Sequence, residues 1–323
     1  MRHEVFLPNY LPRRERNAVY RLKNRKAFES EPVVVRVGGD EFKLRSLWDR
    51  PVPTPVKCLR EAVRLMKHKK DWDNLPAMLE GLNVAGVRLS SPILSKLVRK
   101  AGQLGRQDVI FECAKRVERT GFVMKDLPVV QSIMWWIQYR ALSDNWSLKE
   151  TTRALKMAEQ VSVLLEEKNH AGGPLRDPLD PRARPETIGI LLQLAAAQAK
   201  LLAGTENDGK IKLYANRLLG SLRDGVDFSK ALVPAGDTWW RKDALLFSLS
   251  PVVYGLRLAV EMLPTEPEMV HELRQQETHL SSQVSTARET LLKEIPVQAR
   301  PLGLSCYDKL FGSESFLTPH VVG

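Results

Sequence analysis

The sequence predicts an all-α fold, an α-solenoid of helical hairpins with a small N-terminal β-hairpin and irregular tails. Two observations predict it. Apolar residues recur at helical spacing over most of the 323 residues. Residues 54–124 hold two copies of one helical hairpin, 35 residues apart, and a glycine closes each copy, Gly86 in the first and Gly121 in the second. One such hairpin cannot bury its apolar faces alone, so each copy needs its neighbour.

The 35-residue offset superimposes apolar positions on apolar positions. It pairs Leu59 with Leu94, Val63 with Val98, Leu75 with Ile110, Met78 with Cys113 and Leu82 with Val117. We therefore expect Gly86 and Gly121 in equivalent turns.

Residues 1–31 form a basic arm with few apolar residues, which we expect to be mobile alone and to become ordered against nucleic acid or a larger assembly. Its arginines are similar to those of a mitochondrial presequence. The cations of the arm that we expect to bind RNA are Arg13, Arg14, Arg16, Arg21, Lys23, Arg25 and Lys26. In residues 32–53, alternating valines, Gly38-Gly39 and a second alternating run predict a β-hairpin, which we expect to pack on the first repeat helix, followed by a proline-rich joint.

Residues 54–169 are assigned to helical repeats. Within them, Trp135 and Trp136 are adjacent on a predicted helix and must face different surfaces, either the core between repeats or stacked RNA bases. Four prolines and two glycines make residues 170–185 a linker. Residues 186–295 read as further helical hairpins, and residues 296–323 as an irregular surface tail.

Charge is distributed unevenly. Residues 1–125 contain 27 Lys and Arg against 14 Asp and Glu, whereas residues 126–323 contain 22 against 24. The excess suggests a polyanionic partner for the N-terminal half, with RNA as the first candidate and a solvated basic surface without a partner as the alternative. A predicted helix over residues 55–70 aligns several cations, and the next unit continues them. The stripe comprises Lys57, Arg60, Arg64, Lys67 and Lys70, followed by Arg99, Lys100 and Arg106.

No pattern predicts catalysis. His271-Glu272 begins like a zinc-protease helix, but Gln275 stands where the second histidine is required. No phosphate-binding glycine loop is present, the three cysteines have no metal-ligand spacing, and no apolar run approaches the ~20 residues of a membrane helix. We expect no enzyme, cofactor, metal or membrane span. Cys58 and Cys113 are expected to be reduced and buried on apolar helix faces.

The unit Ser91–Asp126 resembles a degenerate pentatricopeptide repeat, with a helix ending in Lys100-Ala101-Gly102, a second helix through Phe111 and an Arg119-Thr120-Gly121 turn. The resemblance covers the hairpins of residues 54–124 and implies a fungal-type mitochondrial protein of the ribosome or of gene expression. Members of that family commonly bind RNA in mitochondria or chloroplasts, and some are built into mitochondrial ribosomes. Pro92 and Ile93 stand where base-reading polar residues are usual in the family.

Three functions follow as hypotheses. The first is a non-catalytic subunit of a large ribonucleoprotein, the mitochondrial ribosome, which contacts rRNA phosphates and protein neighbours in the matrix. The alternative is a free-standing mitochondrial RNA-binding factor for transcript maturation, stability or translational activation. A tetratricopeptide-like protein scaffold is a third reading.

Overall fold

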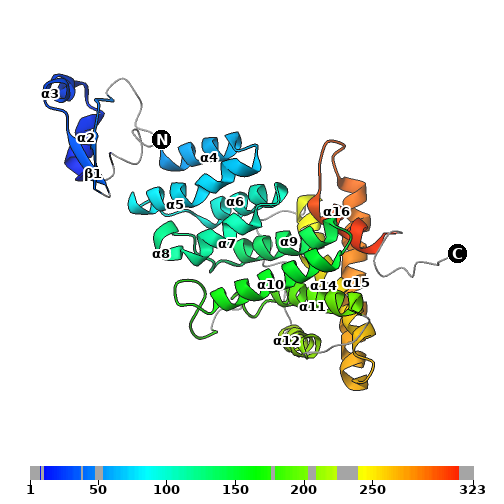
Figure 1. Cartoon of the computed structure of the whole chain (residues 1–323). Helices are drawn as coiled ribbons and strands as arrows, with labels where there is room; N and C mark the ends of the chain where they lie inside the picture. Colours follow the sequence, from blue (N-terminus) through cyan, green and yellow to red (C-terminus); the bar gives the residue numbers. More distant parts are fainter. Residues whose placement is uncertain are drawn as a thin grey trace. The chain divides into compact units, whose positions relative to one another are not determined.

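The computed structural model describes residues 8, 11–37, 39–47, 54–175, 179–202, 209–223 and 239–312, and it divides into two compact units, residues 1–123 and 124–323 (Figure 1). The elements of the first unit are α2 (Arg13–Val19), η2 (Leu22–Asn24), α3 (Arg25–Ser30), β1 (Val34–Val37), β2 (Asp40–Lys43), α4 (Pro55–Leu65), η3 (Lys69–Asn74), α5 (Leu75–Val84), α6 (Ser91–Gln103), α7 (Gln107–Lys115) and α8 (Val117–Thr120). Those of the second are α9 (Leu127–Ser143), α10 (Leu148–Leu165), α11 (Pro185–Leu201), α12 (Lys210–Arg223), α14 (Trp239–Met262), α15 (Pro267–Glu294) and α16 (Leu302–Phe311). The all-α class with one small N-terminal β-hairpin is confirmed.

The N-terminal arm and the β-hairpin form a small folded module. Val34 pairs with Lys43 and Val37 with Asp40 in an antiparallel register, and Gly39 turns the chain with φ +92°. Val19 of α2, Val35 of β1 and Leu44 are buried and pack in one cluster. The arm therefore contributes helices and one core residue, and the hairpin packs on α2, where the sequence suggested the first repeat helix. Gly38 and the joint at residues 48–53 lie outside the described residues.

The two predicted hairpin copies end in matching turns. Gly86 and Gly121 have φ +71° and +67°, a left-handed conformation that favours glycine. Asn83, three residues before the first glycine, donates from Nδ2 to the carbonyls of Glu118 (2.9 Å) and Arg119 (3.0 Å). α5 packs against α7 and α8. One asparagine thus ties the end of the first copy to the end of the second.

The helix predicted over residues 55–70 is shorter than expected. α4 ends at Leu65, and the short helix η3 begins after His68. The backbone N–H of His68 donates to Asp71 Oδ2 at 2.8 Å, which starts the new helix and brings Trp72 into a fully buried position. Lys67 and Lys70 consequently lie beyond α4.

α14 is the centre of the second unit, where it packs against α11, α15 and α16. By length and composition alone it could cross a membrane, but its apolar residues from Leu246 to Ala259 are largely buried among the neighbouring helices. The tryptophan pair is also core. Trp135 stacks on Phe247 at a ring-centroid distance of 4.4 Å and on Tyr139 at 4.7 Å, and Trp136 is 3% exposed. Core packing is therefore the correct reading of the pair, and neither ring is available to a base.

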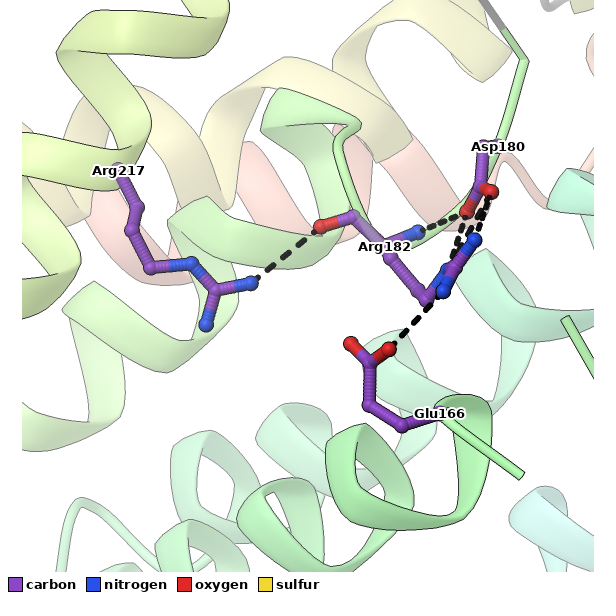
Figure 2. A network of polar contacts seen from close by, with 4 residues as sticks. All are labelled: Glu166, Asp180, Arg182 and Arg217. Carbon is purple, nitrogen blue, oxygen red and sulfur yellow. Dashed lines mark hydrogen bonds and ion pairs between the residues drawn. The ribbon is translucent and has the colours of Figure 1, made fainter. Parts of the chain in front are cut away.

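Asp180 and Arg182 of the proline-rich stretch between α10 and α11 are buried and form the centre of a polar network (Figure 2). The guanidinium of Arg182 donates to Asp180 Oδ2 at 2.7 Å and to Glu166 Oε2 at 2.9 Å. Burial raises the pKa of Asp180, but its hydrogen bonds from Arg182 outweigh this, and the pKa lies below its usual value. His170 accepts from the backbone N–H of Met124 at 3.1 Å. These ion pairs and hydrogen bonds fix a segment that has no helix, whereas composition had indicated only a linker. Residues 176–178 lie outside the described residues.

The expected irregular tail, residues 296–323, instead contains helix α16. Cys306 and Leu310 are fully buried, and Asp243 of α14 accepts from the backbone N–H of Leu304 at 2.9 Å near the helix start. The backbone of Gly303 touches α14, where a Cβ would lie 2.0 Å from the carbonyl oxygen of Asp243. Packing on α14 therefore stabilises a helix that its flanking prolines had obscured. Residues 313–323 lie outside the described residues.

The three cysteines differ in accessibility. All are free thiols, Cys113 and Cys306 are buried, and Cys58 is only half-buried, so its expected burial is corrected. Burial raises the pKa of Cys113 and of Cys306 to about 12. Because the thiolate is the reactive form, we expect a maleimide or disulfide reagent at pH 8 to label Cys58 at least tenfold faster than the other two. Time-resolved mass spectrometry of the native protein measures this, and equal rates for all three would contradict it.

Candidate nucleic-acid interface

A groove of about 490 Å³ lies in the first unit, beside α4 and α6. Its apolar lining consists of Val63, Met66, Trp72 and Leu104. Six basic side chains also line it: Lys57, Arg60, Arg64, Lys67, Lys96 and Lys100. The site is therefore a cationic groove with an apolar floor.

Helix periodicity places these cations. Residues three and four apart share one helix face, so Lys57, Arg60 and Arg64 align on α4 while Leu59 and Val63 are buried on the other side. On α6 the same spacing aligns Lys96 with Lys100, and Leu94, Leu97 and Val98 are buried. The packing of both helices thus directs basic residues to one groove.

The charges of the groove are largely unbalanced. Glu61 is the single carboxylate in its lining. Within the described ranges, none of the six cations forms an ion pair with a carboxylate. Like charges that line a concave surface raise the local concentration of anions. The groove therefore suits an extended polyanion.

The structure separates the other predicted residues of the stripe. Lys70 and Arg99 are exposed outside the groove lining. Arg106 is engaged internally, since its guanidinium pairs with Asp73 at 2.6 Å and Asp108 at 3.1 Å and donates to the Lys69 carbonyl. These bonds join η3 to the start of α7, so we withdraw Arg106 from the predicted RNA contacts. Its side chain is 14% exposed.

Lys96 was missed by the sequence analysis. The signal was present, because Lys96 stands four residues before Lys100 on the same predicted helix. The sequence does not show that α6 lies beside α4. That placement puts Lys96 and Lys100 in one groove with the cations of α4.

The predicted cations of the arm lie mostly on the surface of the N-terminal module. Arg14, Arg21, Lys23 and Lys26 are exposed, and Arg25 pairs with Glu29 at 2.8 Å. Arg16 is half-buried near Tyr20, whose pKa is raised, chiefly by burial. The side chain of Arg13 lies outside the described residues.

The described part of the chain shows no candidate metal site. It contains no group of three or more His, Cys, Asp or Glu residues that could hold a metal ion. His271 and His279 instead pair with Gln275 (2.9 Å) and Gln283 (3.0 Å), one turn along α15.

Two comparisons with known proteins bear on the chain. A family model described as mitochondrial ribosomal protein mS27 matches residues 1–309. The small ribosomal subunit protein mS27 of Neurospora crassa is 32% identical over 169 residues, which cover 51% of this chain and 42% of that protein. The similarity thus spans less than half the length of this relative.

Proposed function

This chain belongs to the mS27 family of mitochondrial ribosomal proteins, and we propose from that membership that it is a non-catalytic subunit of the small subunit of the mitochondrial ribosome. Its place of action is then the mitochondrial matrix, and its partners are rRNA and neighbouring ribosomal proteins. The family match over residues 1–309 is the observation that carries this proposal.

The second part of the proposal is that the groove beside α4 and α6 binds rRNA phosphates. Its support is the set of six cations, unpaired with carboxylates in the described ranges, that line one concave surface. Phosphate contacts position a protein on RNA without reading sequence. The exposed cations of the N-terminal module, with Lys70 and Arg99, extend the basic surface of residues 1–125.

We further propose that the hairpins α4–α5 and α6–α8 are degenerate pentatricopeptide-like repeats. The equivalent left-handed glycines at positions 86 and 121 support this proposal, as do the buried pairs Leu59 with Leu94 and Val63 with Val98 at the same offset. Pro92 and Ile93 at the start of α6 offer no polar side chain to a base. Binding to the RNA backbone agrees with that arrangement better than reading of bases does.

Sedimentation tests the ribosomal assignment. Full-length tagged protein, expressed in its own mitochondria, is expected to co-sediment with the small ribosomal subunit and to move to lighter fractions after RNase digestion. Co-sedimentation with mRNA free of ribosomes would favour a free-standing RNA-binding factor. Sedimentation unaffected by RNase and away from ribosomes would favour a protein scaffold.

A further inference from the structure

A second groove lies in the second unit, where α10, α11 and α12 meet. Its volume is about 300 Å³. Leu165 of α10 and Ile188 and Leu191 of α11 give it an apolar floor, and Leu165 and Leu191 are each 1% exposed.

Two apolar side chains of the lining remain in solvent. Val163 of α10 is 68% exposed, and Leu213 of α12 is 53% exposed. Single exposed apolar residues are common on protein surfaces, but here two from different helices line one groove above an apolar floor. Covering both would remove them from water together, which favours a partner with apolar side chains.

The charged side chains that line this groove differ in whether they already have a partner of opposite charge. Glu159 accepts from Tyr214 Oη and from Lys210 Nζ, each at 3.0 Å. Glu166 is paired with Arg182 at 2.9 Å. Both carboxylates of the lining therefore already have cationic or hydroxyl partners.

Arg217 is the exception. Its guanidinium, reaching from α12, donates a 3.5 Å hydrogen bond to the backbone carbonyl of Arg182 (Figure 2). It has no carboxylate partner among the described residues. A carboxylate supplied from outside the chain would complete it with a charge-assisted bond.

We propose that this groove docks a segment of a neighbouring protein that covers Val163 and Leu213 with apolar side chains and pairs an Asp or Glu with Arg217. The occupant is protein and not RNA, because Val163 and Leu213 require apolar side chains to cover them, which a phosphate backbone does not supply. The charge of this part of the chain also favours a protein partner, since residues 126–323 hold 22 basic and 24 acidic residues and so have no excess of positive charge for RNA. The chain would thus hold RNA with one unit and protein with the other, an assignment that rests in part on the proposed ribosomal function.

Site-specific photocrosslinking tests the proposal. A benzophenone amino acid replaces Val163 in one variant of the full chain, Leu213 in another, and Arg153 in a control, since Arg153 is exposed on α10 outside the groove lining. Irradiation is performed in intact mitochondria, and products are identified by mass spectrometry. The variants at positions 163 and 213 are expected to crosslink to one segment of one protein, with an Asp or Glu within a few residues of the crosslinked position. The control variant at position 153 is expected not to crosslink to that segment.

Charge reversal gives the second measurement. Arg217→Glu is expected to lower the crosslink yield about tenfold, since like charges facing each other across an interface repel. Reversing the partner's carboxylate to Lys is expected to restore the yield. Crosslinks to RNA, no crosslink, or an unchanged yield in Arg217→Glu would overturn the proposal. Sedimentation of the same samples reports separately on ribosome association, so failure of the ribosomal assignment is distinguishable from failure of the docking site.

Discussion

Replacing Glu186 by Ala is expected to lower the free energy of unfolding by up to about 3–5 kcal/mol, because it removes the buried carboxylate that pairs with the Arg184 guanidinium. The two side chains are 1% and 5% exposed, and the Arg184 guanidinium donates to both carboxylate oxygens, at 2.7 and 3.0 Å. The pair lies at the start of α11, the helix that packs on α14 in the core of the second unit. Urea unfolding followed by far-ultraviolet circular dichroism measures the loss.

An exposed ion pair provides the control. Glu272 pairs with Arg223, and their side chains are 43% and 65% exposed. Glu272→Ala should change the unfolding free energy by at most about 1 kcal/mol, since solvent screens such pairs. The double change Arg184→Met with Glu186→Leu should be less harmful than Glu186→Ala alone, because it removes both charges. A Glu186→Ala protein as stable as the wild type would refute the assigned burial cost.

Neutralising three cations of the groove is expected to flatten the salt dependence of RNA binding. Counterion release gives a log–log slope of about −0.7 per single-strand phosphate contact, so replacing Arg60, Arg64 and Lys67 together by Ala should reduce the slope by roughly two units. The loss should be equal for two unrelated RNA sequences, since phosphate contacts do not read bases. Fluorescence anisotropy from low to moderate salt measures both quantities.

The matched control removes the same charge elsewhere in the first unit. Arg88, Lys115 and Arg116 are exposed and lie outside the cationic groove. Their triple alanine variant should keep a slope within about one unit of the wild-type slope. We expect it to lose at most one phosphate contact, and each contact contributes ~0.7 to the slope. An equal effect of both triples would assign RNA binding to the net charge and not to the groove. A loss confined to one RNA would indicate sequence reading.

Periodicity predicted the helices well, because the apolar positions that define a helix face are local in the sequence. Helical hairpins were expected over residues 186–295, and the structure has helices α11, α12, α14 and α15 there. The equivalent turns at Gly86 and Gly121 followed from the 35-residue offset, and the structure shows that both glycines are left-handed. The alignment of Lys57, Arg60 and Arg64 followed from spacing on one helix.

What the sequence left unpredicted depends on contacts between distant segments. α16 is helical because Asp243 and the surface of α14 lie at its start, about 60 residues earlier in the chain. Arg106 looked like a member of the basic stripe until Asp73, 33 residues away, was placed against it. Pairing of this kind depends on tertiary structure and leaves no periodic pattern.

The small N-terminal module has a consequence for turnover of the protein. Among the described residues, its core is small: Val19, Val35 and Leu44 are buried, and six other apolar side chains that pack on them are only half-buried. We therefore expect the module of a free chain to open more readily than the helical core of the second unit, and to be accessible to proteases when open. A partner that binds only the closed form shifts that equilibrium by mass action. Copies that fail to assemble would be degraded from this end first, so the abundance of the protein would follow that of its partner.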